Sequence, residues 1–562
     1  MSTSQKLSVV ERIKTNSDAL RGTLKESLTD DITGSLREDD QSLIKFHGLY
    51  QQDDRDRREE RSAKKLEWLY SYMIRLRLPA GIMTPQQWIG LNHIAGEHST
   101  GTIKITTRQT VQLHGILKSH IKPAIQSFNT LHLDSIAACG DVNRNVIYSA
   151  HPATSPLHKE IEDYATWISE MALPKTRAYY EIWLDKEQIL NKEEETDPLY
   201  QDRYLPRKFK IAIAVPPDND VDVFGNDIGL IAVIDNGKFL GFNIAAGGGL
   251  STTHGNASTY ARVGSMLGFV SGKENILKAV YEIITIQRDF GNRSDRKLAR
   301  LKYTIDRIGV DNFRTELEKR CGFRLEPAKP YSFKYRGDHF GWQRNQDKTW
   351  NYTVFTENGL VKDDTSCALK TGLYALAEQG KVMFRFTCNQ NLVLSDIKDK
   401  DKEDVIKLLS QFGIDAHTEK AGMLRRNAIA CVAFPTCPLA LAEAQRYLPA
   451  LISKIEPLLS KHGLENDEIY LRMTGCPNGC GRSYLAEIGL IGTAYGKYNL
   501  HIGGDRLGER LNLKYRENLE EPAILETLDA LFEQYANERE PGEALGDFAI
   551  RRKLVGGNFV TA

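Results

Sequence analysis

Two distant stretches of this sequence share one pattern, and this internal repeat constrains the fold more than any other feature. The stretch IKITTRQTVQLHGI from Ile103 aligns without a gap with FRFTCNQNLVLSDI from Phe384. At almost the same offset, RNVI from Arg144 matches RNAI from Arg426. Two further matches follow in the same order, DIGLI with EIGLI and FNIAAGG with YNLHIGG, and they begin at Asp227, Glu487, Phe242 and Tyr498. The repeat predicts a duplicated unit with pseudo-two-fold symmetry.

Local periodicity predicts both strands and helices in this unit. KFKIAIAV from Lys208 and EIYLRMT from Glu468 have the composition of strands. Helical spacing is found in ENILKAVYEIITIQRDFG, in LALAEAQRYL and in ALISKIEPLLSKHG, which begin at Glu274, Leu439 and Ala450. Pro449 is expected to separate the last two. The predicted fold class is therefore α+β, a duplicated fold with pseudo-two-fold symmetry.

The repeat also predicts where the chain divides. Residues 1–72 are polar and charged, with the run QQDDRDRREERSAKK from Gln51, and we expect a solvated arm that could dock a partner. Residues 73–138 and 331–415 are the matched early parts of the repeat and should pair into one domain. Residues 139–330 and 416–562 are the two later halves.

Composition excludes some classes of partner. Lys plus Arg equals Asp plus Glu, 74 each, so net charge indicates neither a nucleic-acid nor a membrane partner. No apolar run approaches the ~18 residues of a membrane span. The first residues, MSTSQKLSVVERIKTNSDAL, lack the apolar core of a signal peptide. We expect a cytoplasmic protein, in which cysteines stay reduced.

Four of the eight cysteines form two close pairs in the second copy of the repeat. Cys431 and Cys437 lie in CVAFPTCPLA, and Cys476 and Cys480 lie in TGCPNGCGRSY. Four thiolates with this spacing suit either an iron–sulfur cluster or, less well, a structural zinc ion. Nearby glycines allow close backbone approach, so that N–H groups can point at sulfur. The repeat aligns GCPNGC with VPPDND from Val215, so the first copy has no equivalent cysteines.

The cysteine motifs and several others resemble the siroheme-dependent sulfite and nitrite reductases. The resemblance runs from about residue 40 to the C-terminus, and it includes FHGLYQQDDRD, TTRQTVQLHGI, GDVNRNVI, YLPRKFKIAI, GGGLS, YNLHIGGDRLGER and GDFAIRR. It implies three domains around one siroheme and one [4Fe-4S] cluster that are electronically coupled. By that likeness Cys431, Cys437, Cys476 and Cys480 are the cluster ligands. Cys480 would also bridge to the siroheme iron.

The family activity is the six-electron reduction of sulfite to sulfide in sulfate assimilation and cysteine biosynthesis, and many members also reduce nitrite. CGRSYL after Cys480 looks more like the NADPH-linked members, since ferredoxin-linked relatives often have CARPY. The resemblance therefore implies a separate NADPH-dependent flavoprotein (alpha) subunit as electron donor. A ferredoxin-dependent sulfite or nitrite reductase is the alternative, and a zinc-stabilised binding protein is a distant one.

The resemblance also assigns basic residues to the site. Arg75, Arg144, Lys208 and Lys210 would bind the anionic substrate, and a lysine in such a site could deliver protons. Lys208 and Lys210 are two residues apart on a predicted strand, so they should project from one face. Siroheme is a polycarboxylate and needs a basic lining. The expected cofactor-binding residues are Lys104, Arg108, His114, Arg207, Asn389, Gln390 and Cys480.

Overall fold

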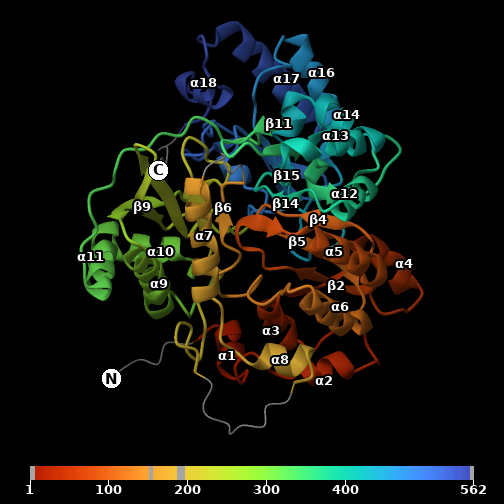
Figure 1. Ribbon diagram of the computed structural model, residues 1–562, viewed down its shortest axis with the longest axis vertical. Coiled ribbons are helices and arrows are strands. Elements are labelled where there is room, and N and C mark those ends of the chain that lie inside the picture. Colours follow the sequence, from red (N-terminus) through yellow and green to blue (C-terminus); the bar gives the residue numbers. More distant parts are fainter. Residues whose placement is uncertain (1–6, 151–155, 187–195, 557–562) are drawn as a thin grey trace.

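The computed structural model describes residues 7–150, 156–186 and 196–556. It contains four five-stranded sheets, which form two pairs of like topology. Figure 1 shows the chain arranged around them, with the yellow and green elements on the left, the orange and teal elements on the right and the blue C-terminal helices at the top. Within the described residues, no helix is both long and apolar enough to cross a bilayer.

Sheets I and II are antiparallel throughout and form the first pair. Sheet I contains, in spatial order, β1 (Leu49–Asp53), β2 (Tyr70–Arg75), β5 (Val111–Ile116), β4 (Ile103–Ile105) and β13 (Leu360–Val361). Sheet II contains β11 (Gly341–Arg344), β12 (Trp350–Val354), β15 (Leu392–Ile397), β14 (Met383–Phe386) and β3 (Ile82–Met83). The β4–β5 and β14–β15 hairpins are the two aligned stretches of the repeat, so the duplication predicted from the sequence is confirmed.

The two antiparallel sheets exchange one short strand each. β3 comes from the first copy but pairs with β14 of the second, and β13 comes from the second copy but pairs with β4 of the first. Helices α5 (Pro85–His98) and α12 (Leu369–Glu378) pack against each other, and the ring of Trp88 stacks on Phe384 with centroids 4.7 Å apart. The two copies therefore form one interlocked body.

Sheets III and IV form the second pair, and both mix parallel with antiparallel strands. Sheet III contains β6 (Ile147–Tyr148), β7 (Ile211–Ala214), β8 (Ile228–Asp235), β9 (Lys238–Ala246) and β10 (Ser265–Val270). Sheet IV contains β16 (Ile429–Ala430), β17 (Leu471–Thr474), β18 (Ile488–Ala494), β19 (Lys497–Ile502) and β20 (Leu513–Leu519). In each sheet the first three strands are parallel and the last two pairings are antiparallel.

Helices pack against sheets III and IV. Sheet III packs against α7 (Pro156–Met171), α9 (Lys273–Phe290) and α11 (Val310–Cys321), and α10 (Leu301–Ile308) lies beside α9. Helix α9 confirms the helix expected from Glu274. Near sheet IV, α16 (Leu448–Lys461) packs against α17 (Glu521–Glu538), with the short α18 (Leu545–Arg551) nearby.

The helix predicted over residues 439–448 is absent from the described chain. Pro449 lies in the first turn of α16, where its fixed φ is tolerated, and does not separate two helices. The amides of Leu441 and Ala442 donate instead to the carbonyl of Gly475, at 2.8 and 3.0 Å. Tertiary hydrogen bonds between the two cysteine loops therefore replace the local helical ones.

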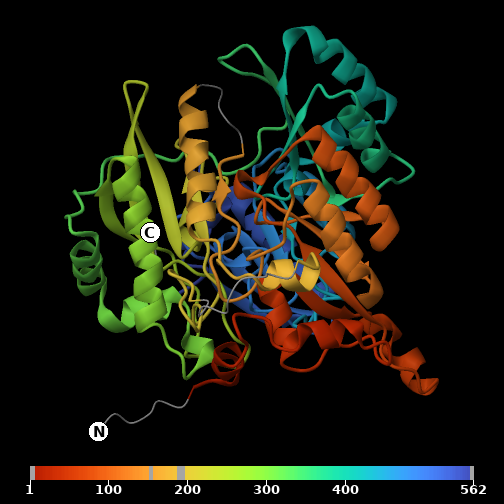
Figure 2. The ribbon, with the colours of Figure 1, turned by 60° about the horizontal axis from the view of Figure 1, so that its bottom comes forward.

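Much of the first segment is packed rather than solvated. Leu20, Leu24, Leu43 and Leu49 are buried in the main core, and β1 is the edge strand of sheet I. Short helices α1 (Val9–Thr15), α2 (Leu24–Thr29), α3 (Asp40–Leu43) and α8 (Ala178–Trp183) lie together at the bottom of Figure 1. Figure 2 shows the red α4 (Arg58–Ala63) projecting from this surface. Residues 20–53 are thus no detached arm, and the other predicted domain boundaries stay predictions.

Candidate functional site

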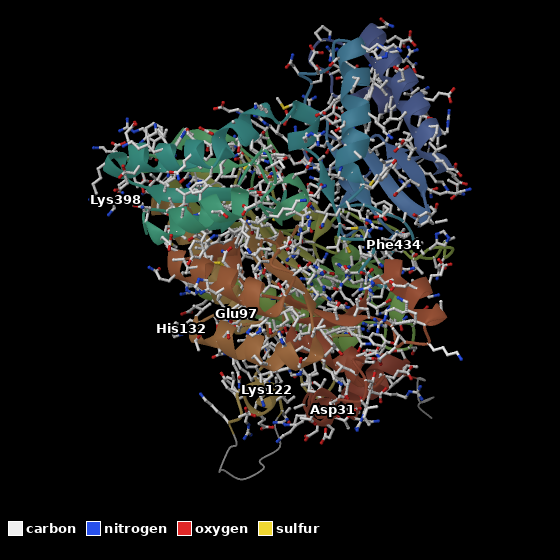
Figure 3. The ribbon with its side chains drawn as sticks, turned by 90° about the vertical axis from the view of Figure 1, so that its right-hand side faces the viewer. Asp31, Glu97, Lys122, His132, Lys398 and Phe434 are labelled. Carbon is white, nitrogen blue, oxygen red and sulfur yellow. The ribbon has the colours of Figure 1, made fainter. Side chains whose placement is uncertain are left out.

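The two cysteine pairs meet at one edge of sheet IV. Cys431 directly follows β16, and Cys476 follows β17 by two residues. These strands are parallel neighbours, so the loops leaving their carboxyl ends lie side by side. The amide of Gln445 donates to the carbonyl of Cys431 at 3.1 Å, which ties the first loop together. In Figure 3, Phe434 of this loop lies where the blue C-terminal unit meets the orange N-terminal elements.

Backbone and side-chain donors in these loops point at sulfur. Cys431 Sγ accepts from the Gly475 amide at 3.3 Å and from Thr474 Oγ1 at 3.5 Å, and Cys476 Sγ accepts from Asn478 Nδ2 at 3.5 Å. Gly475 has no room for a side chain, because a Cβ there would lie 2.6 Å from the Ala442 carbonyl oxygen. Gly479 has a φ of +63°, which favours glycine. The glycine-rich motif thus performs the close approach expected from the sequence.

The four thiols are near enough to affect one another electrostatically. Burial raises the pKa of Cys431 and of Cys437 to about 12, and the charge of Cys480 acts in the same direction. Burial and Cys480 also raise the pKa of Cys476. Four thiolates at such a place need a positively charged partner. A cubane iron–sulfur cluster takes one thiolate per iron, so four cysteines gathered at one place match its ligand set.

A basic cavity adjoins Cys480. Besides Arg482, its cations are Arg108 from the turn between β4 and β5, Lys208 and Lys210 from the extended segment before β7, and Arg300 just before α10. The remaining lining residues are Thr107, Ile147, Val221, Asp222, Gly225, Asn226, Leu250, Ser251, Asn478, Gly479, Cys480 and Arg482. The cavity therefore lies between the cation-bearing first half and the thiol-bearing second half.

Among the described residues, the two lysines in this cavity are not neutralised by nearby carboxylates. Burial lowers the pKa of Lys210 to about 7, with the charges of Arg108 and Arg300 acting in the same direction. Burial, then Lys210 and Arg207, lower the pKa of Lys208 far below its usual range. Within the described residues, neither ammonium group has a carboxylate partner, and Nε of Arg108 lacks any acceptor. A buried excess of positive charge fits a polycarboxylate cofactor and an anionic substrate.

Asp222 is the one carboxylate among the described residues that line the cavity, and it forms ion pairs with three arginines. Asp222 bonds Arg336 at 2.7 Å, Arg472 at 2.5 Å and Arg482 at 2.9 Å, and all four side chains are buried. These guanidinium groups hold the pKa of Asp222 far below its usual range despite burial. Arg336 and Arg472 still have N–H groups without acceptors. This cluster, which we call the Asp222 cluster, leaves positive charge in excess on the side of the second half.

Arg144 lies with the cavity cations, whereas Arg75 lies farther along sheet I. Arg144 contributes to lowering the pKa of both Lys208 and Lys210, and its Nη2 bonds Tyr50 Oη at 3.4 Å. Arg75 donates to Cys139 Sγ at 2.9 Å, and its Nε also reaches the Gln112 amide oxygen, in its satisfied orientation, at 2.8 Å. The ring of Tyr50 lies 5.9 Å from the Arg75 guanidinium and so links the two arginines.

Two predicted cofactor-binding residues lie on strands of sheet I and already have hydrogen-bond partners in the protein. Lys104 donates to the carbonyl of Asn358, and burial lowers its pKa to about 7. His114 Nδ1 bonds Gln52 at 3.0 Å, and its Nε2 bonds the Gln112 amide at 3.1 Å. Burial, together with Lys104 and Arg75, lowers the pKa of His114 to about 3, so its ring is neutral. Neither residue lines the cavity, and their contact with a cofactor stays a prediction.

Three further predicted residues lie close to the cavity wall. Arg207 is 4.0 Å from Asp141, and burial lowers its pKa to about 10. Asn389 accepts from Arg482 at 2.9 Å, and Gln390 accepts from the Ala430 amide at 3.3 Å. Both lie on the β14–β15 turn, which is the counterpart of the turn that carries Arg108.

Sequence reasoning missed some of the cavity lining. Arg300 bonds Asp227 at 2.8 Å and Ser251 at 3.3 Å, and Asn226 accepts from Arg108 at 2.5 Å. Arg300 lies in no repeat match and in no quoted motif, so no local signal could have identified it. Arg482 lay in the quoted CGRSY stretch, but its role depends on Asp222, which is distant in the sequence.

Comparisons with known proteins agree with this architecture. The family model for the nitrite and sulphite reductase 4Fe-4S domain matches residues 164–325, and the model for the nitrite/sulfite reductase ferredoxin-like half domain matches residues 69–131 and 343–412. The second model matches the regions of sheets I and II. The first matches the unit of sheet III, which precedes the cysteine loops.

Close relatives cover nearly the whole chain. A sulfite reductase [NADPH] hemoprotein beta-component from Leptospira biflexa is 61% identical over 98% of this chain and 99% of its own length. The protein of that name from Staphylococcus haemolyticus is 51% identical over 98% of this chain and 96% of its own length. Among solved structures, the NirA protein of Mycobacterium tuberculosis superposes with a TM-score of 0.78 at 25% identity, covering 98% of this chain and 97% of that one.

Proposed function

This chain belongs to the siroheme-dependent nitrite and sulfite reductase family, and on that premise we propose that it is the hemoprotein beta subunit of an NADPH-dependent sulfite reductase. Its reaction is the six-electron reduction of sulfite to sulfide, in which the three oxygens leave as water. In the cell this reaction would serve sulfate assimilation and cysteine biosynthesis. A ferredoxin-dependent enzyme or a zinc-stabilised binding protein is not favoured by these relatives.

One structural observation carries the proposal. The edge of sheet IV that gathers four thiols opens onto a basic cavity, in which Lys208 and Lys210 have no carboxylate partner among the described residues, and Cys480 belongs to both. A binding protein has no need for these two features to meet. An enzyme that delivers electrons to a bound anion requires such a meeting.

The family cofactors fit these residues. Cys431, Cys437, Cys476 and Cys480 would hold the [4Fe-4S] cluster, and Cys480, which also lines the cavity, would contact the siroheme as well. Arg108 and Arg300 line the cavity where cofactor carboxylates need partners, and Lys104, His114, Arg207, Asn389 and Gln390 are further candidates. When bound, the coupled pair supplies electrons at an iron that the substrate can reach.

Arg75, Arg144, Lys208 and Lys210 would bind and orient the anion. Arginine forks suit oxyanions, and the two lysines add charge from one extended segment. A lysine whose pKa lies near 7 gives up its proton readily at neutral pH, so Lys210 can protonate a departing oxygen. Lys208, beside it, is the second candidate donor.

Electrons would come from a separate subunit. The relatives are named as beta-components, which supports a partner, and the NADPH-linked name supports a flavoprotein (alpha) subunit. None of the eight cysteines, all of which lie in the described residues, forms a disulfide, which supports a cytoplasmic location.

The test is anaerobic turnover of purified protein supplied with siroheme, with reduced viologen as electron donor. Sulfide production with sulfite favoured over nitrite in kcat/KM is the expected result. Preference for nitrite would assign the chain to the sister activity. A protein that holds both cofactors but reduces neither anion would contradict the proposal.

A further inference from the structure

Helix α1 carries two buried charged side chains. Glu11 and Lys14 are each only 1% exposed, although most residues near a chain terminus are poorly held. Burying an ion pair costs desolvation energy and is sustained only when its remaining hydrogen bonds are made. Such a pair in a helix of one or two turns therefore indicates a specific attachment to the body of the protein.

The attachment is to the backbone of residues 204–205 and to Asp141. Lys14 Nζ bonds the Glu11 carboxylate and the Leu205 carbonyl, the latter at 2.7 Å, and lies 3.6 Å from Asp141 Oδ2. The other Glu11 oxygen bonds Arg293 Nη1 at 2.5 Å, and Arg293 Nη2 donates to the Tyr204 carbonyl at 2.8 Å. Two neighbouring carbonyls are thus held through one helix.

These attachment points lie on the two segments that carry the proposed anion-binding residues. Residues 140–144 and 204–210 run side by side, because Leu205 N donates to Asp141 O, Phe209 N to Val142 O and Arg144 N to Phe209 O, each at 3.0 Å. Arg144 ends the first segment, and the second contains Lys208 and Lys210. Lys14 contacts both segments at their far end from the cavity.

Asp141, which Lys14 approaches, is also surrounded by two arginines. Asp141 bonds Arg296 at 2.6 and 2.9 Å and lies 4.0 Å from Arg207, and it is 2% exposed. Arg296 and Lys14 hold its pKa far below its usual range despite burial. Asp141 therefore joins the helix, the Arg207 side chain and the first segment in one network.

We infer that α1 is a clasp that positions the anion-binding segments, and that Lys14 is its positioning residue. The inference rests on the proposed anion role of Arg144, Lys208 and Lys210. Lys14 touches neither the cavity nor the thiols. It acts by fixing the Leu205 carbonyl and Asp141, and through them the spacing of the cations on the two segments.

The test compares Lys14→Met with Arg12→Met in the holoenzyme. Arg12 lies on the same helix but is exposed, so it is a matched control. Amide hydrogen exchange is read in peptides that cover 140–144 and 204–210, with β18 as an internal reference. Lys14→Met should lose protection in those two segments only, retain siroheme absorbance, and raise KM for sulfite roughly tenfold with kcat changed less than about twofold. Arg12→Met should match the parent.

A second variant keeps the test valid if Lys14→Met fails to fold. Glu11→Gln with Lys14→Met removes both charges of the pair, and the new amide oxygen can still accept from Arg293, so folding should survive while the Leu205 anchor is lost. Unchanged exchange in the two segments, in whichever variant folds, would overturn the clasp.

Lys208→Met, measured in parallel, separates two kinds of failure. If the segments loosen but KM is unchanged, the inference is overturned. If Lys208→Met also leaves turnover unchanged, the fault lies in the proposed anion role of the segment. If Lys208→Met impairs turnover, that role stands and the clasp alone is wrong.

Discussion

Sheets III and IV place equivalent loops at equivalent edges. In sheet III, Ile211 pairs with Ile228, and in sheet IV, Leu471 pairs with Ile488, at the same separation along the chain. The loop after β7 has the sequence VPPDND, and the loop after β17 has GCPNGC. One scaffold thus presents thiols in the second half and none in the first.

The residues just before β7 and β17 also differ, and here it is the first half that carries the functional side chains. Lys208 and Lys210 of the first half correspond to Glu468 and Tyr470 of the second, where Tyr470 Oη donates to Glu468 at 2.5 Å. The first half therefore supplies two lysines that lack a carboxylate partner in the described part of the chain, whereas the second half has a tyrosine and a glutamate that bond each other. The comparison teaches that, on the proposed roles, the two copies divide the chemistry: one would bind the anion and the other would bind the metal centre.

The halves also meet through an unlike pair at matched positions. Asp222 and Arg482 both have left-handed backbone, with φ of 48° and 58°, and they bond each other at 2.9 Å. A strictly symmetric dimer would place like charges here. Divergence between the copies has turned this contact into an attraction.

The largest expected effect tests the thiol side of the comparison. Cys476→Ser should remove the cluster and reduce viologen-linked sulfite turnover by at least about a thousandfold, because electrons then lack their route. Iron content and the visible spectrum measure the loss. Cys321→Ser is the control: burial raises the pKa of that thiol to about 11, and it lies at the end of α11, so iron and activity should be retained.

The cation side should give a smaller but still large effect. Replacing Lys208 and Lys210 together by Met should lower kcat/KM for sulfite about a hundredfold to a thousandfold, because charge stabilisation and proton delivery are both lost. Tyr470→Phe alters the matched place in the second half and should leave kcat/KM within about twofold. Equal effects of the two changes would contradict the division of chemistry between the halves.

The Asp222 cluster tests the contact between the halves. Asp222→Asn leaves three buried arginines without their shared carboxylate, so unfolding should become easier by about 3–5 kcal/mol. The shift in the denaturation midpoint measures this, with the exposed Asp235→Asn as control. Because the folded pKa of Asp222 is depressed, its stabilisation is present above about pH 4 and is lost only at still lower pH.

A matched pair of carboxylates gives the smallest and most specific prediction. Asp227 is paired with Arg300, whereas Glu487, among the described residues, accepts only from the amides of Tyr470 and Gly546, and burial raises its pKa to about 7. A carboxyl with a raised folded pKa favours folding while protonated. Its contribution of about 3 kcal/mol is therefore lost as the pH rises from about 4 to about 7.

The pH dependence is read from a difference between two proteins. The Glu487→Gln variant has no carboxyl to ionise at this position, so it should not lose this stability as the pH rises. The thermal midpoint of the variant minus that of the parent should therefore increase from pH 4 to pH 7. A constant difference across that range would show that folding does not shift the pKa of Glu487, and it would contradict this prediction.

The sequence was sufficient for features that repeat or recur in one local pattern. The aligned hairpins, the helix from Glu274 and the convergence of the cysteine pairs all follow from periodicity and spacing. The residues around the thiols were harder. LALAEAQRYL has helical spacing, yet its amides bond Gly475, which is far along the chain. Local propensity cannot anticipate a hydrogen-bond acceptor supplied by another loop.

Single residues recruited from distant segments left no trace in the sequence. Arg300 reaches the cavity from just before α10, and Arg336 and Arg472 reach Asp222 from two other parts of the chain. Glu11 and Lys14 have ordinary helical spacing and look like a solvated pair, but the fold buries them. Burial of a charge depends on what packs over it, and only the assembled structure supplies that information.

The exchange of β3 and β13 has a consequence for how the chain is made. Sheet I lacks its last strand until Leu360 and Val361 have emerged from the ribosome, and β3 has no partner until β14 follows. During synthesis, the edge of β4 therefore stays open while residues 106–359 are made, and open edges favour association between chains. We expect the protein to complete its folding only after its second half has been synthesised. Neither copy of the repeat should therefore fold when it is produced alone.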